Sequence, residues 1–149
     1  MNLPKTMKAH LILLFAALGL MPILASEAPA APKGGKLFPL DGEYLEFFVN
    51  ADHHGEIVIY DPVLKAVSTG DREITVTAGT REKQEKLSVE KGDAMWTTSD
   101  LPAGDGYFVI IQVREAAGDA PKTFRLRYVA ETCPGCNLPE YACTCEHAH

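Results

Sequence analysis

The chain has 149 residues, of which 14 are basic and 20 are acidic, so its formal net charge at pH 7 is −6. An acidic balance argues against nucleic acids and anionic membrane surfaces as partners, because both attract basic patches. The length suits one domain with a hydrophobic core of ordinary size.

The first 25 residues have the organisation of a secretory signal peptide. Lys5 and Lys8 form a short basic region, an apolar run follows over residues 11–24, and Ala25 offers a cleavage site. This run is too short for a comfortable membrane span of about 20 residues, which disfavours the alternative of a retained membrane anchor. We therefore expect an exported protein, periplasmic or secreted, with no stable membrane insertion after the signal is cleaved.

The next residues change from a flexible composition to a strand-forming one. Residues 26–36 are rich in Ala, Pro and Gly, and they predict a disordered linker. From residue 37 onward, short runs of β-branched and aromatic residues are separated by turn residues. These runs predict seven strands, over residues 44–49, 56–60, 73–78, 86–89, 94–97, 107–113 and 123–129.

The pattern within these runs predicts how they pack. In the last one, Phe124, Leu126 and Tyr128 alternate with Arg125 and Arg127, which is the period of a half-buried antiparallel strand. Residues 107–113 are the most apolar run and are expected to form a central strand. Short strands without helical periodicity predict an all-β fold, a single immunoglobulin-like antiparallel β-sandwich of about seven strands. The expected organisation is a signal peptide, a linker, a β-sandwich domain and an irregular cysteine-rich tail, over residues 1–25, 26–36, 37–130 and 131–149.

The sequence contains none of the common local catalytic motifs. It has no GxSxG elbow, no phosphate-binding loop and no dinucleotide fingerprint. His53 and His54 lie in a predicted turn with no serine or cysteine nucleophile beside them. A small exported sandwich of this kind is more often a binding module, so we do not expect an enzyme.

Two stretches of the predicted sandwich resemble a known group of proteins. GGKLFPLDGEYLEFFV and EIVIYDPVLKAV, both within residues 34–67, are similar to small exported β-sandwich proteins of bacterial heavy-metal handling and efflux. In that group a histidine commonly precedes the glycine pair, whereas Lys33 stands there in this chain, which argues against a metal ligand at this position. The resemblance implies metal handling outside the cytoplasm, with a metal-efflux or envelope protein as a partner.

The tail contains every cysteine of the chain, at Cys133, Cys136, Cys143 and Cys145. The Pro-Gly between the first two predicts a type II turn with Gly135 at positive φ, which would place both sulfurs on one side. In an extended chain, residues two apart such as Cys143 and Cys145 point to the same face. A second turn at residues 137–140 would fold one pair onto the other, so that four thiolates converge.

Four converging thiolates predict a metal site. Tetrahedral sulfur coordination suits Zn²⁺, and soft thiolates also select Cu⁺. His147 and His149 follow at alternate positions and are expected to be auxiliary ligands. The spacing is more compact than that of a zinc ribbon and is closer to Cu⁺-binding or metallothionein-like clusters. The expected function is to sequester or pass on zinc or copper outside the cytoplasm.

Two other interpretations of the cysteines remain open. An even number of cysteines in an exported protein usually means disulfides, and the tail would then be the stapled cap of a non-enzymatic envelope module that contacts a protein or glycan. A redox role for the Cys-Pro-Gly-Cys stretch is disfavoured, because the stretch follows a strand and does not open a helix. The two terminal histidines have no role in a staple, and they favour metal.

Residues 52–55, with the sequence Asp-His-His-Gly, are a second candidate for metal binding. Asp and Gly are common turn residues, so a plain hairpin turn explains this stretch as well. The metal interpretation depends on whether the fold brings this loop next to the tail.

Overall fold

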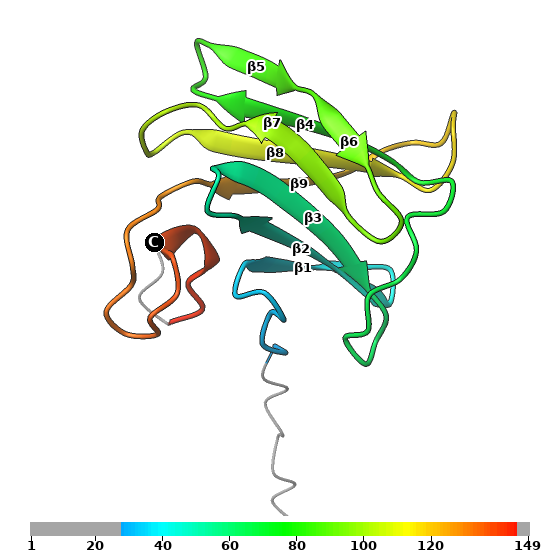
Figure 1. Cartoon of the computed structure of the whole chain (residues 1–149), viewed down its shortest axis with the longest axis horizontal. Helices are drawn as coiled ribbons and strands as arrows, with labels where there is room; N and C mark the ends of the chain where they lie inside the picture. Colours follow the sequence, from blue (N-terminus) through cyan, green and yellow to red (C-terminus); the bar gives the residue numbers. More distant parts are fainter. Residues whose placement is uncertain (1–27, 146–149) are drawn as a thin grey trace, which may run out of the picture.

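The computed structural model describes residues 28–145, and these residues form an all-β protein with one short 3-10 helix (Figure 1). The strands are β1 (Lys36–Leu40), β2 (Glu43–Val49), β3 (His54–Tyr60), β4 (Glu73–Gly79), β5 (Gln84–Leu87), β6 (Val89–Lys91), β7 (Trp96–Asp100), β8 (Phe108–Arg114) and β9 (Lys122–Arg127). They form a five-stranded sheet in the order β1-β2-β3-β7-β6 and a four-stranded sheet in the order β5-β4-β8-β9. All neighbouring strands are antiparallel. The predicted antiparallel β-sandwich is confirmed.

The two sheets enclose one apolar core. Leu45 and Phe47 of β2 and Val109 and Ile111 of β8 are fully buried, and Trp96 of β7 packs with them. These positions alternate with outward-facing ones, as expected for strands that contribute one face to a core. Burial of this apolar surface is the main favourable contribution to folding.

The structure also confirms the predicted facing of the last strand. Leu126 and Tyr128 are buried, Phe124 packs against the core from its edge, and Arg125 and Arg127 are exposed. The apolar run at residues 107–113, which largely corresponds to β8, lies between two neighbours in its sheet, as predicted for a central strand.

Two features of the sheets were not predicted. The single strand predicted at residues 86–89 is divided between two strands, because the chain passes at Ser88 from β5 in one sheet to β6 in the other. The strand β1 was also missed, since Pro39 interrupts its pattern. Proline is tolerated there because β1 lies at the edge of its sheet and pairs only with β2.

A buried carboxylate holds the segment that precedes β1. Glu46 of β2 is fully buried and points away from the core, and its carboxylate accepts hydrogen bonds from the backbone N–H groups of Lys33 (2.9 Å) and Gly35 (2.8 Å). The hydroxyl of Tyr60 donates a third bond of 2.9 Å. The Lys33 side chain forms a 2.6 Å ion pair with Glu56. A carboxylate with this many donors is well satisfied without water. We refer to residues 33–35 as the N-terminal strap.

Candidate metal centre

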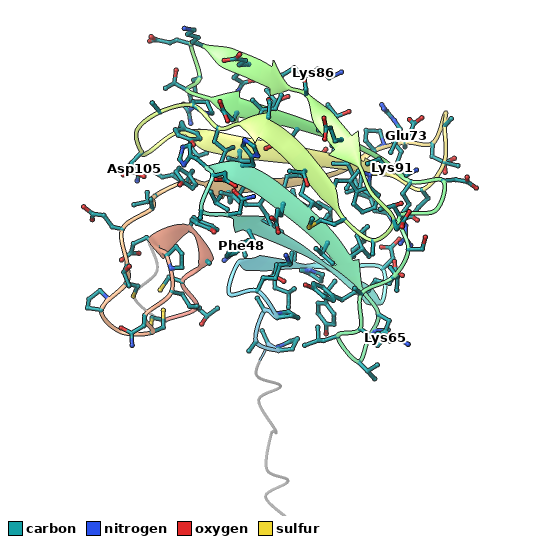
Figure 2. All side chains as sticks on the ribbon, in the orientation of Figure 1. Phe48, Lys65, Glu73, Lys86, Lys91 and Asp105 are labelled. Carbon is teal, nitrogen blue, oxygen red and sulfur yellow. The ribbon has the colours of Figure 1, made fainter. Side chains whose placement is uncertain are left out.

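The cysteine-rich tail follows β9 and lies at one end of the sandwich (Figure 1). An isolated bridge between Thr132 and Pro139 closes a loop that contains Cys133 and Cys136. Within this loop the N–H of Cys133 donates to the carbonyl of Leu138, at 2.8 Å. The sulfur atoms of the tail gather in and beside this loop, as Figure 2 shows.

The turn at the first cysteine pair differs from the predicted one. The N–H of Asn137 donates to the carbonyl of Cys133 at 2.9 Å, and Asn137 itself takes the left-handed conformation, with φ of 58°. Gly135 does not have positive φ, so the predicted type II turn is wrong. Asparagine is among the few residues that enter the left-handed region readily. Glycine at position 135 instead avoids crowding, because a Cβ there would lie 3.0 Å from Cys145 Sγ.

The second cysteine pair follows the 3-10 helix η1 (Glu140–Ala142). The N–H of Cys143 donates to the carbonyl of Glu140 at 3.1 Å, and Cys143 has φ of −58° and ψ of 135°, so the chain leaves the helix extended. The N–H of Cys145 then donates to the sulfur of Cys143, at 3.4 Å. The loop and the helix together fold the second pair back onto the first.

Tyr141 anchors this arrangement in the core of the sandwich. Its side chain is only 6% exposed and stacks on Tyr128, with ring centroids 5.4 Å apart. It also makes an edge contact with Phe47 at 6.0 Å, and its hydroxyl accepts a hydrogen bond of 3.1 Å from the N–H of Val49. Cys143 comes two residues later, so the core fixes the position of the second cysteine pair.

The four sulfur atoms lie within 4.8 Å of one another. Three of the contacts join Cys133 to Cys143 (3.3 Å), Cys136 to Cys143 (3.6 Å) and Cys133 to Cys145 (3.9 Å). Around a tetrahedral Zn²⁺ with Zn–S bonds of about 2.3 Å, neighbouring sulfurs are about 3.8 Å apart. All four cysteines are free. The cluster therefore has the ligand number and the spacing that a single soft metal ion requires.

The surroundings of the cysteines give their thiols different pKa values. A hydrogen bond from the backbone of Leu138, with further bonds from the neighbouring thiols, lowers the pKa of Cys136 to about 7 despite partial burial. Hydrogen bonds to Cys136 and Cys143, together with burial, raise the pKa of Cys145 to about 12. The backbone N–H of Cys145 lowers the pKa of Cys143, but hydrogen bonding to Cys133 and burial outweigh it, so this pKa is raised. Cys136 is therefore the thiol of these three that most readily supplies a thiolate.

None of the histidines within residues 28–145 belongs to the cysteine cluster. His147 and His149 lie outside the described residues. At residues 52–55, His54 is the first residue of β3 and its Nε2 lies 2.8 Å from Asp100 Oδ1, while His53 lies in the turn before β3 and its ring makes an edge contact with Tyr128 at 6.0 Å. The turn before β3 thus packs through His53 on the tyrosine that holds the tail. Within residues 28–145, however, the cluster of metal-ligand side chains consists of the four cysteines alone.

Two residues that support the cluster were not identified from the sequence. Tyr141 is the aromatic residue of the tail, and Glu46 is an acidic residue between the apolar Leu45 and Phe47. An aromatic residue in the tail and a charged residue within an apolar run are the sequence signals that could have identified them. The strap that Glu46 holds reaches the cysteine loop, because a Cβ at Gly34 would lie 3.5 Å from Leu138 Cδ2.

Comparison with known proteins gives no matching family model, no matching curated protein and no matching solved structure. Residues 28–145 contain no helix that is both long enough and apolar enough to cross a membrane. The assignment of function therefore depends on the chemistry of the cysteine cluster.

Proposed function

We propose that this chain is an exported protein that binds one soft metal ion, Zn²⁺ or Cu⁺, through Cys133, Cys136, Cys143 and Cys145. The observation that carries this proposal is the convergence of the four sulfur atoms within 4.8 Å. In this role the protein sequesters the ion or passes it on, and it is a binding protein rather than an enzyme. His147 and His149, which follow Cys145 in the sequence, are proposed as auxiliary ligands.

Both Zn²⁺ and Cu⁺ belong to the proposal. A tetrahedral set of four thiolates is typical of zinc sites, and sulfur contacts of 3.3, 3.6 and 3.9 Å are close to the expected spacing. Cu⁺ is a softer ion and competes for the same thiolates. Competition between the two ions for the purified protein separates these assignments.

Export and partners belong to the same proposal. The signal-peptide pattern of residues 1–25 supports export to the periplasm or the exterior. The resemblance of residues 34–67 to exported metal-handling sandwiches supports a metal-efflux or envelope protein as the partner.

The test is metal analysis of reduced, purified protein after incubation with Zn²⁺ or Cu⁺ and removal of excess ion. We expect one ion per chain. Deletion of the tail is a poor control, because it would also remove Tyr141 from the core. Replacement of all four cysteines by serine removes the ligands and keeps this anchor. Thr144→Ser, at an exposed position between two of the cysteines, is the matched control. Equally negligible metal in the wild-type protein and the serine variant contradicts the proposal.

A disulfide-stapled tail is the second candidate function, and one observation favours it. The contacts Cys133–Cys145 and Cys136–Cys143 would allow both pairs to oxidise with small movements. The tail would then be the cap of an envelope module that binds a protein or glycan. The intact mass of protein isolated without reductant decides between the two, because reduction of two disulfides adds about four hydrogens.

A further inference from the structure

The cysteine cluster has an inner and an outer side. Cys133 and Cys143 are buried, with 7% and 4% of their surface exposed, whereas Cys136 and Cys145 are only partly buried. The inner pair is close to the core, since Cys143 follows the buried Tyr141 and Ala142. Solvent therefore reaches the cluster mainly through the other two sulfurs.

The outer side is bordered by exposed residues of small size. Pro134, Gly135 and Thr144 are all exposed, and each is a sequence neighbour of a cysteine. Gly135 presents no side chain to Cys145, since even a single Cβ there would approach its sulfur to 3.0 Å. The backbone of Gly135 thus packs beside this sulfur, and the exposure of Pro134, Gly135 and Thr144 leaves this side of the cluster facing solvent. We refer to Cys136, Cys145 and Gly135 as the exchange edge.

The two buried sulfurs lie close together, since Cys133 and Cys143 are 3.3 Å apart, and all four sulfurs lie within 4.8 Å of one another. Release of Cys136 or Cys145 from a shared ion therefore leaves this buried pair in place with one further sulfur beside it.

We infer that a metal ion held by this cluster enters and leaves across the exchange edge, by ligand exchange with a thiol-bearing donor or acceptor. This inference rests on the proposed metal-binding function. In the first steps an incoming thiolate forms a new metal–sulfur bond while the bond to Cys136 or Cys145 breaks, and in the last steps further thiolates of the acceptor replace Cys133 and Cys143 in the same way. Entry of the ion follows the reverse order. The proton of the incoming thiol passes to the departing cysteine or to solvent. Neither the metal nor any sulfur changes oxidation state.

The first experiment follows the transfer of Zn²⁺ from the loaded protein to the chromophoric chelator pyridylazoresorcinol. Reduced glutathione and reduced thioredoxin are added in separate arms, which distinguishes a small thiol from a protein thiol. We expect the transfer rate to rise in proportion to thiol concentration in at least one arm, by about tenfold for a tenfold increase. A rate that is independent of both thiols overturns the inference.

The second experiment compares outer and inner ligands in single variants. Cys136→Ser and Cys145→Ser are expected to retain Zn²⁺ and to release it at least about tenfold faster, whereas Cys133→Ser and Cys143→Ser are expected to bind little. Equal effects at inner and outer positions contradict an exchange edge. Circular dichroism of each variant identifies loss of folding.

Gly135→Ala keeps the inference testable if the serine variants do not fold. The added methyl group crowds Cys145, so the thiol-dependent rate should change severalfold, while Pro134→Ala serves as the matched control. An unchanged rate in Gly135→Ala contradicts the inference. The failure of the proposed function gives a different result, because the wild-type protein would then hold no metal at all.

Discussion

Tyr141 stacks on Tyr128, with ring centroids 5.4 Å apart and an angle of 27° between the ring planes. Tyr128 directly follows β9 and stacks in turn on Tyr107 at 5.0 Å. Offset stacking at such distances is favourable beyond the burial of area alone. This contact makes the cysteine-rich tail part of the sandwich core, so the stability of the fold and the organisation of the metal centre are coupled.

The first prediction follows from this coupling. Tyr141→Ala removes a buried aromatic side chain and is expected to lower the free energy of unfolding by about 3–5 kcal/mol. It should also weaken Zn²⁺ binding, because Cys143 loses its anchor. Urea denaturation of the metal-free protein measures the first effect, and competition with a chelator measures the second.

Tyr141→Phe is the matched control for this substitution. It keeps the stack and removes only the hydroxyl that accepts the hydrogen bond from Val49. The expected loss of stability is about 1 kcal/mol, with metal affinity retained. If the alanine variant binds Zn²⁺ as tightly as the wild-type protein, the coupling is refuted.

The second prediction concerns the buried carboxylate of Glu46. Glu46→Ala leaves the N–H groups of Lys33 and Gly35 and the hydroxyl of Tyr60 without an acceptor, and is expected to cost about 3 kcal/mol or more. Glu46→Gln should cost less, about 1 kcal/mol, because the hydroxyl of Tyr60 can reverse its role and accept from the new amide.

Limited digestion with trypsin provides a local readout for this prediction, since Lys33 lies in the strap that Glu46 holds. Faster cleavage after Lys33 is expected in the alanine variant than in the wild-type protein. Glu82→Ala, at an exposed position, is the control and should change neither stability nor cleavage. Unchanged cleavage in the Glu46 variant would show that the strap is held by other contacts.

Sequence patterns predicted the parts of this molecule that depend on local order. Alternation around Leu126 predicted which face of the last strand is buried, and cysteine spacing predicted that the tail sulfurs meet. The left-handed residue of the turn was misplaced, because the need for space beside Cys145 and the need for positive φ both favour glycine. The glycine at position 135 meets the first need, and Asn137 takes the positive φ.

The features that were missed depend on contacts between distant parts of the chain. Tyr141 is anchored by Tyr128, which follows β9, and by Val49, which is the last residue of β2 in the other sheet. No local pattern in the sequence specifies these contacts. The sheet crossing at Ser88 is invisible for a similar reason. Alternating polar and apolar residues look the same in the sequence whether one sheet or two receive them.

The third prediction concerns stability at acidic pH. Burial alone would raise the pKa of Glu56, but hydrogen bonds from Lys33 and Asn50 and the charge of Lys33 outweigh it, so the pKa is lowered. A carboxyl with a lowered pKa in the folded state stabilises the protein above its unfolded pKa of about 4.3. This contribution is lost as the pH falls through the lower, folded value.

Urea denaturation between pH 7 and pH 3 of the wild-type protein and Glu56→Gln tests this expectation. The wild-type protein should be more stable at pH 7, by about 1 kcal/mol or less because the ion pair is partly exposed, and the difference should shrink below about pH 4.5. Glu82→Gln should show no such convergence. A constant difference across this range would assign the effect to packing rather than to charge.

The fourth prediction concerns the order in which the thiols react in reduced, metal-free protein. Because the pKa of Cys136 is lowered to about 7 and that of Cys145 is raised to about 12, Cys136 should be alkylated by iodoacetamide well before Cys145 at neutral pH. Thiolate is the reacting form, so the rate at Cys136 should fall by nearly tenfold between pH 8 and pH 6. Digestion and mass spectrometry with fragmentation assign each modified cysteine.

Bound Zn²⁺ should slow the reaction at Cys136, since a coordinated thiolate is less available to the reagent. Alkylation that begins at Cys145 would contradict the expected order of acidities, and alkylation of Cys136 that proceeds equally with and without Zn²⁺ would show that Cys136 does not bind the ion.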